Sequence, residues 1–234
     1  MVRKNSPRDI VNRFMNKENK DDVSMDFGNP DMECLSFLRS SFSSTQLSDA
    51  MSKTLGYSGV VRGVRSINFE GKIFGRILTV RTGSDDWGTC LLGIDEAEPG
   101  EVLFIYTGDL DGAVWGELTS TESAKRGIQG TVIYGATRDV DALKFIDYPV
   151  FALGNVPNAG LASGLGEIRT SVIIDDHKIS DGDFAFGDEN GLVVIPQDKF
   201  ELVVRKTLEI KEGEKDIISQ LELGASLSEI TGLK

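Results

Sequence analysis

The stretch from Ala113 to Asp139 constrains the fold more than any other part of the chain. A short apolar run, AVW, is followed by a glycine, a helical segment, LTSTESAKRG, and a second apolar run, GTVIYG. A continuous β-branched run without polar alternation is typical of a strand buried on both faces. The order strand, helix, strand predicts a right-handed β-α-β unit whose two strands are parallel.

The geometry of such a unit decides where its charged residues lie. The helix runs back from the carboxyl edge of the first strand by roughly 14 Å at about 1.5 Å per residue. The second strand then climbs by roughly 20 Å at about 3.3 Å per residue. Glu117 follows the first strand and the pair Arg138–Asp139 follows the second, so we expect all three residues at one edge of the sheet. Ligands of open α/β sheets tend to bind at that edge.

These residues favour a small anionic ligand together with a cation. The start of the helix offers free amides near Leu118 and Thr119, and Arg138 presents a planar fork to a carboxylate. Glu117 and Asp139 suit such a place if a hard divalent cation, Mg²⁺ or Mn²⁺, lies between them. The spacing alone leaves a second interpretation open, in which Arg138 forms a surface ion pair with one acid and the other acid caps a helix.

Composition limits the chemistry that the chain can perform. The 234 residues carry a formal net charge of −12, which argues against a nucleic-acid surface. No apolar run has the length of a membrane span or the character of a signal peptide, so we expect no membrane partner and a cytoplasmic location. Cys34 and Cys90 have neither metal-site nor disulfide-framework spacing. His177 is the only histidine and is interpreted as a turn residue, so carboxylates, arginine, amides and a metal must carry any polar chemistry.

The rest of the pattern predicts one α/β domain. Helices are expected over residues 43–56, 86–97 and 139–147, and a long amphipathic helix over about 197–223. Strands are expected within residues 71–82, 100–108 and 148–154, followed by a β-rich section from 168 to 196. Residues 1–33 are polar and are interpreted as an extension that includes a short helix over 8–15.

The run VWGELTSTESAKRGIQGTVIYGATRDVDALKFIDYPVFALG and the shorter runs QLSDAM, GDENGLVVIP and KEGEKDIISQLELGASL resemble those of the RraA-like family. The resemblance extends from about Leu35 to the end of the sequence. The family includes class II pyruvate aldolases that act on 4-hydroxy-4-methyl-2-oxoglutarate and 4-carboxy-4-hydroxy-2-oxoadipate, and the regulator of ribonuclease activity A. The resemblance implies a β/β/α sandwich of the swivelling-domain type over residues 34–234, after an N-terminal extension of residues 1–33. It also implies homotrimers or homohexamers with shared sites.

The resemblance assigns roles to the residues at the predicted sheet edge. In the aldolases the motif is an acid, twenty residues and an Arg-Asp pair, and Glu117, Arg138 and Asp139 match it, with Glu where Asp is common. By resemblance, Asp139 binds the metal directly and Glu117 binds it through a water. Arg138 and the amides of Leu118 and Thr119 hold the pyruvyl group, so Arg138 and Glu117 are the expected catalytic residues.

A third acid is implied from another subunit. The family places a glutamate of a neighbour's C-terminal helix near the metal, and Glu214 best matches it. The alternative is that Glu214 lies on a solvated face of an acidic helix, where Glu212 also lies.

The expected function is therefore a divalent-metal-dependent lyase that acts on a small 2-oxo acid. It would cleave a C–C bond next to a pyruvyl unit, by retro-aldol cleavage of a 4-hydroxy-2-oxo acid or by decarboxylation of oxaloacetate. The rival expectation is a non-catalytic protein that regulates a ribonuclease or another large partner. Glu117 favours the enzyme, because regulators resembling this family tend to lack an acid there.

Overall fold

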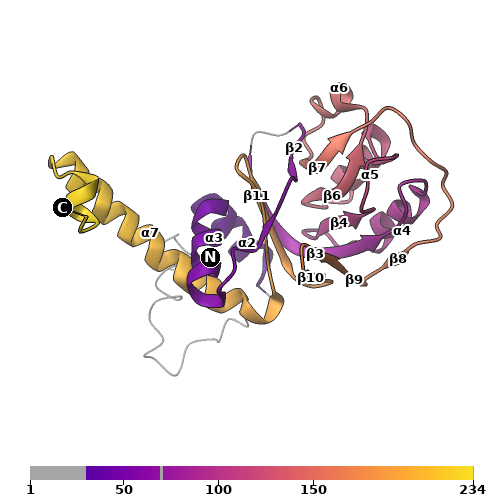
Figure 1. Ribbon diagram of the computed structural model, residues 1–234. Helices are drawn as coiled ribbons and strands as arrows, with labels where there is room; N and C mark the ends of the chain where they lie inside the picture. The colour runs from indigo at the N-terminus through magenta and orange to yellow at the C-terminus, as the bar shows by residue number, and fades with distance from the viewer. Residues whose placement is uncertain (1–29, 69–70, 234) are drawn as a thin grey trace, which may run out of the picture.

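The computed structural model of the protein describes residues 30–68 and 71–233 (Figure 1). The described helices are α2 (Met32–Ser41), α3 (Ser44–Leu55), α4 (Gly88–Glu96), α5 (Glu117–Lys125), α6 (Val140–Leu143), the 3-10 helix η1 (Gln197–Lys199), α7 (Phe200–Glu222) and α8 (Leu227–Ile230). The described strands are β1 (Val60–Val61), β2 (Arg65–Ser66), β3 (Ile73–Arg81), β4 (Val102–Tyr106), β5 (Ala113–Trp115), β6 (Gly130–Thr137), β7 (Val150–Asn155), β8 (Glu167–Ile168), β9 (Ser171–Ile174), β10 (His177–Ser180), β11 (Phe184–Asp188) and β12 (Gly191–Ile195).

Most of the described strands belong to one curled mixed sheet. Its order is β1-β12-β11-β3-β4-β6-β7-β2, with β5 beside β6 and β8 beside β3. Strands β3, β4, β6 and β7 are parallel, whereas β11, β12 and β1 at one end and β2 at the other are antiparallel to their neighbours. The two ends approach where β12 contacts β2, so the sheet forms a half-barrel. The expected mixed α/β fold is confirmed.

The core has three layers of apolar side chains because the sheet is covered on both faces. Phe104 and Val132 belong to one buried cluster, while Trp115 and Ile133 belong to a second cluster that also contains residues of α4 and α6. Phe200 belongs to a third cluster, in which α2, α3 and α7 pack on β3, β11 and β12. Successive residues Val132 and Ile133 of β6 are both fully buried, which explains its uninterrupted apolar run.

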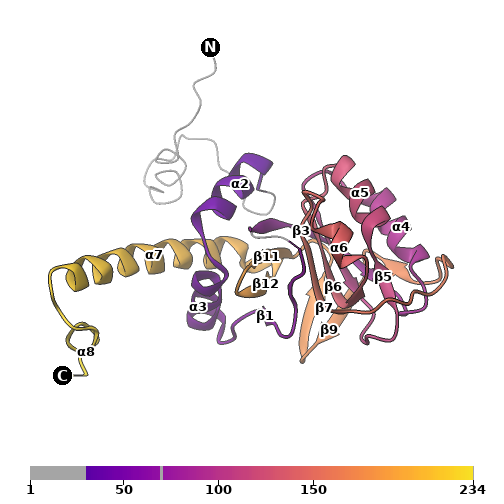
Figure 2. The same ribbon diagram turned by 90° about the horizontal axis from the view of Figure 1, so that it is seen from above.

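Helix α7 packs on the body over its first turns and then extends away from it. Phe200, Val203 and Leu208 are buried against the third cluster. In both views the later turns lie far from the sheet and end near α8 (Figures 1 and 2). Ile218 in this outer part is 55% exposed. The outer part of α7 therefore carries apolar side chains that do not pack on the core of their own chain.

The structure confirms the predicted β-α-β unit and most of the other elements. Strands β5 and β6 are parallel, with Ala113 opposite Ala136. Helix α3 begins at a capping box made by Ser43 and Gln46 and ends at Gly56, which adopts φ 80°. The long C-terminal helix begins after a single 3-10 turn. Helix α2 was not predicted, and the short helix expected over residues 8–15 lies outside the described residues.

The interpretation of His177 as a turn residue is wrong. Asp175 and Asp176 make the turn, with φ values of 47° and 65°, and His177 begins β10 opposite Ile174. Its ring stacks on Tyr57 with 4.8 Å between centroids. Two adjacent Asp residues take the left-handed conformations of a tight hairpin more readily than His does, so the turn closes before the histidine.

Candidate active site at the carboxyl edge of the sheet

Hydrogen bonds join the carboxyl ends of β5 and β6 at the predicted site. Strand β5 ends at Trp115 and α5 begins two residues later, while β6 ends at Thr137. The amide of Arg138 donates to the carbonyl of Trp115 at 2.9 Å, and the hydroxyl of Thr137 donates to the same carbonyl at 3.1 Å. These bonds bring Glu117 and the Arg138–Asp139 pair to one edge of the sheet.

The carboxylate of Asp139 lies on the first amide of α5. The N–H of Glu117 donates to Oδ2 of Asp139 at 3.2 Å, and Nε of Arg138 lies 3.6 Å from the same oxygen. The side chains of Arg138 and Asp139 are 44% and 39% exposed, so a solute can reach both. Within the described residues no hydrogen bond reaches the other carboxylate oxygen, Oδ1. The acid is thus oriented through one oxygen and open at the other.

The next two amides of α5 remain available. Neither the N–H of Leu118 nor that of Thr119 donates a hydrogen bond within the part of the chain described. The carboxylate of Glu117 is exposed beside them. Free amides at the start of a nine-residue helix, next to a guanidinium, form a place for a small carboxylate.

Glu214 does not join this edge within one chain. It lies on α7, where its Oε2 accepts a hydrogen bond from Nε2 of Gln46 on α3 at 2.5 Å. Helix α7 and the α5–α6 region lie at opposite sides of the body in both views (Figures 1 and 2). Across the described ranges, no three Asp, Glu, His or Cys side chains gather into a metal-binding group. One chain brings together two acids of the predicted set, Glu117 and Asp139.

Oxygen ligands of this kind fit a hard cation that retains water. Mg²⁺ is usually held by one or two carboxylates and several waters, so the two acids of one chain are an adequate protein contribution. The open Oδ1 of Asp139 and the exposed carboxylate of Glu117 are the atoms that such a cation would use. Because Arg138 carries a fixed positive charge, it would bind an anionic small molecule rather than the metal.

A buried carboxylate that was not expected from the sequence joins two loops, around residues 83–88 and 161–166. Asp86 is 6% exposed. Its Oδ1 accepts from the amides of Gly88, Ser163 and Gly164, all at 2.9 Å, and its Oδ2 accepts from the amide of Leu165 at 2.9 Å. Burial alone raises the pKa of this carboxyl, but the hydroxyl of Thr89 and the amides of Gly164, Leu165 and Gly88 outweigh it and hold the pKa well below its usual range. In the sequence Asp86 resembles an ordinary acid at the start of a helix, because three of its amide donors lie 77 to 79 residues away.

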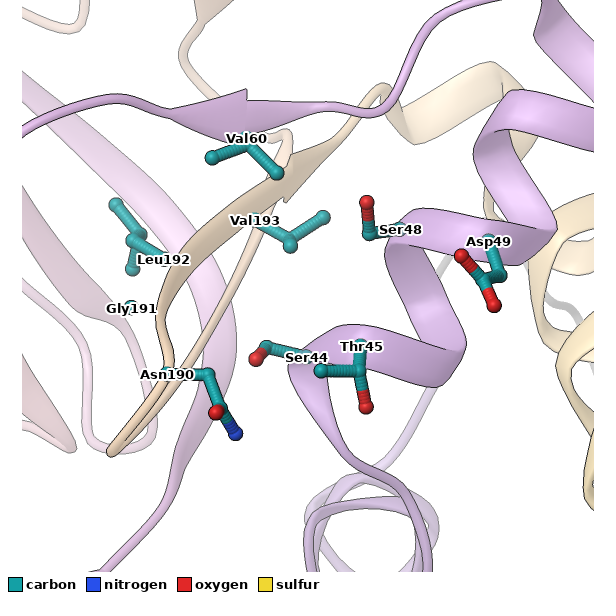
Figure 3. Close-up of a pocket in the computed structure, with 9 residues that line it drawn as sticks. All are labelled: Ser44, Thr45, Ser48, Asp49, Val60, Asn190, Gly191, Leu192 and Val193. Carbon is teal, nitrogen blue, oxygen red and sulfur yellow. The ribbon is translucent and has the colours of Figure 1, made fainter.

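The runs QLSDAM and GDENG, which are far apart in the sequence, meet at a separate pocket. The pocket of about 200 Å³ lies between the first turns of α3 and strands β1 and β12, with Ser48, Asp49 and Val60 among its lining residues (Figure 3). Buried Asp188 of the GDENG run accepts from the amide and hydroxyl of Ser44 at 2.8 and 2.6 Å. The carboxylate of Asp188 therefore caps the start of α3. This contact stabilises the fold, and it explains why the two runs lie together.

The comparison with known families identifies the family to which the chain belongs. The sequence profile of the RraA-like family, described as Aldolase/RraA, matches residues 44–194. This span is more than half of the chain and includes Glu117, Arg138 and Asp139. The chain belongs to the RraA-like family. The resemblance found from the sequence is therefore confirmed.

Individual relatives of this RraA-like protein have different names. The chain is 34% identical over 196 residues to an uncharacterized protein, MJ0644, of Methanocaldococcus jannaschii, covering 82% of this chain and 91% of the relative. It is 31% identical to a Halalkalibacterium halodurans protein named "Putative 4-hydroxy-4-methyl-2-oxoglutarate aldolase", covering 69% and 76% of the two chains. Among solved structures it is similar to the RNA-processing inhibitor RraA of Thermus thermophilis, with 26% identity, a TM-score of 0.60, and coverage of 66% and 93%.

None of the helices in residues 30–68 and 71–233 is both long and apolar enough to span a membrane.

Proposed function

We propose that this RraA-like protein is a divalent-metal-dependent lyase that cleaves a C–C bond next to a pyruvyl unit. The substrate would be a 4-hydroxy-2-oxo acid, or oxaloacetate in a decarboxylation. The observation that carries the proposal is the Asp139 carboxylate, oriented by the first amide of α5 and adjacent to Arg138 and to two free amides. Relatives named as aldolases support the reaction class. A cytoplasmic location is part of this proposal.

The residues of one chain divide into a metal side and a substrate side. Asp139 would bind Mg²⁺ or Mn²⁺ directly and Glu117 would bind it through a water. When bound, the cation supplies a Lewis acid that stabilises negative charge on the keto oxygen of the substrate. Arg138 and the amides of Leu118 and Thr119 hold the carboxylate of the pyruvyl group and oppose the charge that develops during bond cleavage.

Proton transfer would use water rather than histidine. His177 stacks on Tyr57 at β10 and is not among the residues that surround Asp139. Glu117 is exposed, and no hydrogen bond of the described residues occupies its carboxylate. A water held by Glu117 would accept the proton of the substrate hydroxyl and later return a proton to the pyruvyl methylene carbon.

The second half of the proposal is a site completed by a neighbouring subunit. Leu118 on α5 and Phe145 just after α6 are 80% and 91% exposed, while Ile218 and Leu223 on the outer part of α7 and just after it are 55% and 88% exposed. Two apolar surfaces at opposite ends of one chain favour head-to-tail contact, which closes into a ring when the rotation allows it. A homotrimer or homohexamer assembled in this way would carry Glu214 toward a neighbour's metal.

A pyruvate-release assay tests the reaction. Purified protein is incubated with oxaloacetate and a panel of 4-hydroxy-2-oxo acids, after treatment with EDTA and after addition of Mg²⁺ or Mn²⁺. We expect release that EDTA abolishes and either cation restores. Undiminished turnover in thoroughly demetallated protein would refute metal dependence. No release from any acid in protein that binds the cation would instead favour a binding protein, as in the RNA-processing inhibitor.

Mixed oligomers test the shared site. Asp139→Ala and Glu214→Ala should each be inactive alone, and co-refolded mixtures should recover part of the activity because some interfaces regain both acids. Glu212→Ala, at an exposed neighbour on the same helix, is the matched control and should remain active. Full activity in a monomer, or no complementation in demonstrably mixed oligomers, would show that Glu214 serves only its own chain through Gln46.

A further inference from the structure

Gly116 lies between β5 and α5, where the space for a side chain is already taken. A β-carbon at this position would lie 2.4 Å from Oδ2 of Asp139 and 3.2 Å from Cγ of Arg138. The backbone of Gly116 is extended, with φ −172° and ψ −154°, a conformation open to other residues. Glycine is therefore required at this position because a side chain would clash with its neighbours, and not because the backbone conformation demands it.

The missing side chain is what allows Asp139 to reach α5. Its Oδ2 accepts from the amide of Glu117, the residue directly after the glycine, at 3.2 Å. A methyl group on Gly116 would stand at the place that this oxygen occupies. To bring the added β-carbon and Oδ2 to an ordinary van der Waals distance of 3.4 Å or more, the carboxylate would have to move by about 1 Å or more, or the backbone of Gly116 would have to shift away from Asp139.

The backbone of Gly116 is held and does not easily make room. Its N–H donates to Oγ1 of Thr119 at 3.0 Å, and the hydroxyl of Thr119 donates to the carbonyl of Gly116 at 3.0 Å. Thr119 is 7% exposed, so both bonds are protected from water. The carbonyl of Gly116 also accepts from the amide of Ser120 at 3.1 Å. The strain of an added side chain would fall on Asp139 and Arg138.

Asp139 is itself held in an uncommon backbone conformation. Its φ is 55° and its ψ 34°, in the left-handed region, and its carbonyl accepts from the amide of Leu143 at 3.0 Å. Such a conformation costs on the order of 1–3 kcal/mol and persists only where the surroundings fix it. The contact with the first turn of α5 is one of the interactions that fix it.

We propose that Gly116 is a positioning residue for the metal-binding acid: its lack of a side chain sets the carboxylate of Asp139 on the first amide of α5, with one oxygen bound and the other open. The inference rests on the proposed function, in which Asp139 binds the cation. Gly116 does not touch the cation or the substrate and acts through Asp139 and Arg138.

Mn²⁺ binding, measured by titration calorimetry and by the signal of free Mn²⁺ in electron paramagnetic resonance, tests this role without turnover. Gly116→Ala should weaken Mn²⁺ affinity by about 10- to 100-fold, the range for loss of a group that orients a metal ligand. Gly154→Ala, on strand β7 of the same sheet, is the matched control, since its β-carbon would meet only methyl groups of Leu110 at 3.6 Å. The control should bind Mn²⁺ as the wild type does.

A second pair of variants covers the case in which Gly116→Ala does not fold. Thr119→Val removes the hydroxyl that fixes Gly116 while it keeps the shape of the side chain, and it should weaken Mn²⁺ binding several-fold. Thr119→Ser should restore the affinity, because the hydroxyl returns. Circular dichroism melting checks that each variant is folded.

The outcomes separate the inference from the proposed function. Wild-type protein that binds no Mn²⁺ would overturn both the proposed function and the role of Gly116. Wild-type binding that is matched by folded Gly116→Ala, or by Thr119→Val, would overturn the role of Gly116 alone.

Discussion

Replacement of Asp86 by Asn isolates the contribution of one buried carboxylate to the stability of the two loops that it joins. The substitution preserves shape and removes a negative charge. All six groups around the two carboxylate oxygens are donors: four backbone amides and the hydroxyls of Thr82 and Thr89. The best orientation of Asn keeps its oxygen on three amides and lets its NH₂ donate to the hydroxyls. The amide of Leu165 then faces another donor and loses its acceptor.

The expected loss of stability follows from these contacts. A buried donor without an acceptor costs about 1–3 kcal/mol, and hydrogen bonds to a charged group are worth more than those to a neutral one. The orphaned amide and three weakened bonds together give about 3 kcal/mol. In a chain of this size 1 kcal/mol shifts the Tm by about 2–4 °C, so we expect a decrease of about 6–12 °C.

The same carboxylate makes a pH-dependent contribution of known sign. The folded pKa of Asp86 lies below the unfolded value of about 3.9, so the folded state favours the ionised form. Its stabilisation is fully present above the unfolded pKa and is lost as the pH falls through the folded pKa. The difference between wild type and Asp86→Asn should thus be constant from pH 7 to 5 and shrink below about pH 4.

Urea unfolding followed by circular dichroism measures both effects, at pH 7 and at pH 3 on the acid side of the isoelectric point near 4.6. Asp85→Asn makes the same charge change at an exposed neighbour and should alter the free energy of unfolding by less than about 0.5 kcal/mol. If Asp86→Asn were as stable as Asp85→Asn at pH 7, the loop would not depend on this carboxylate, and the reasoning would be refuted.

Three further experiments, two substitutions and one labelling reaction, have defined outcomes. Arg138→Lys keeps the charge but loses the planar fork, so kcat/KM for pyruvate release should fall by about 10²–10³; nearly full kcat/KM would exclude the role of the guanidinium. Asp188→Ala leaves the amide and hydroxyl of Ser44 without their buried acceptor and should lower the free energy of unfolding by about 2–4 kcal/mol in urea titrations, whereas an unchanged midpoint would contradict that contact. Burial, with a smaller effect of nearby Asp31, raises the pKa of Cys34 to about 12, and burial raises that of Cys90 further. Neither thiol should therefore react with Ellman's reagent at pH 8 until the protein is unfolded, and rapid labelling of the native protein would show that the core opens.

Local patterns were sufficient to predict the elements that carry the candidate site. The uninterrupted β-branched run of β6 requires burial on both faces, and a parallel partner one helix earlier then follows from chain handedness. That is why the convergence of Glu117 with Arg138 and Asp139 could be expected from their spacing. Helix α2 was missed because it directly follows a polar segment, and its buried residues Leu35 and Leu38 are stabilised by contacts with distant segments of the chain.

Contacts between distant segments could be decided only by the tertiary structure. Asp86 and Asp188 look like ordinary surface acids in the sequence, yet each is buried and accepts hydrogen bonds from segments about 77 and 144 residues away. Gly116 looks like a turn glycine, but its role depends on where the carboxylate of Asp139 lies in three dimensions. The sequence determined which backbone segments form and in which direction they run, since propensity and periodicity act over a few residues. The tertiary structure decided which polar groups meet, because burial lets a hydrogen bond select one partner among many chemically identical ones.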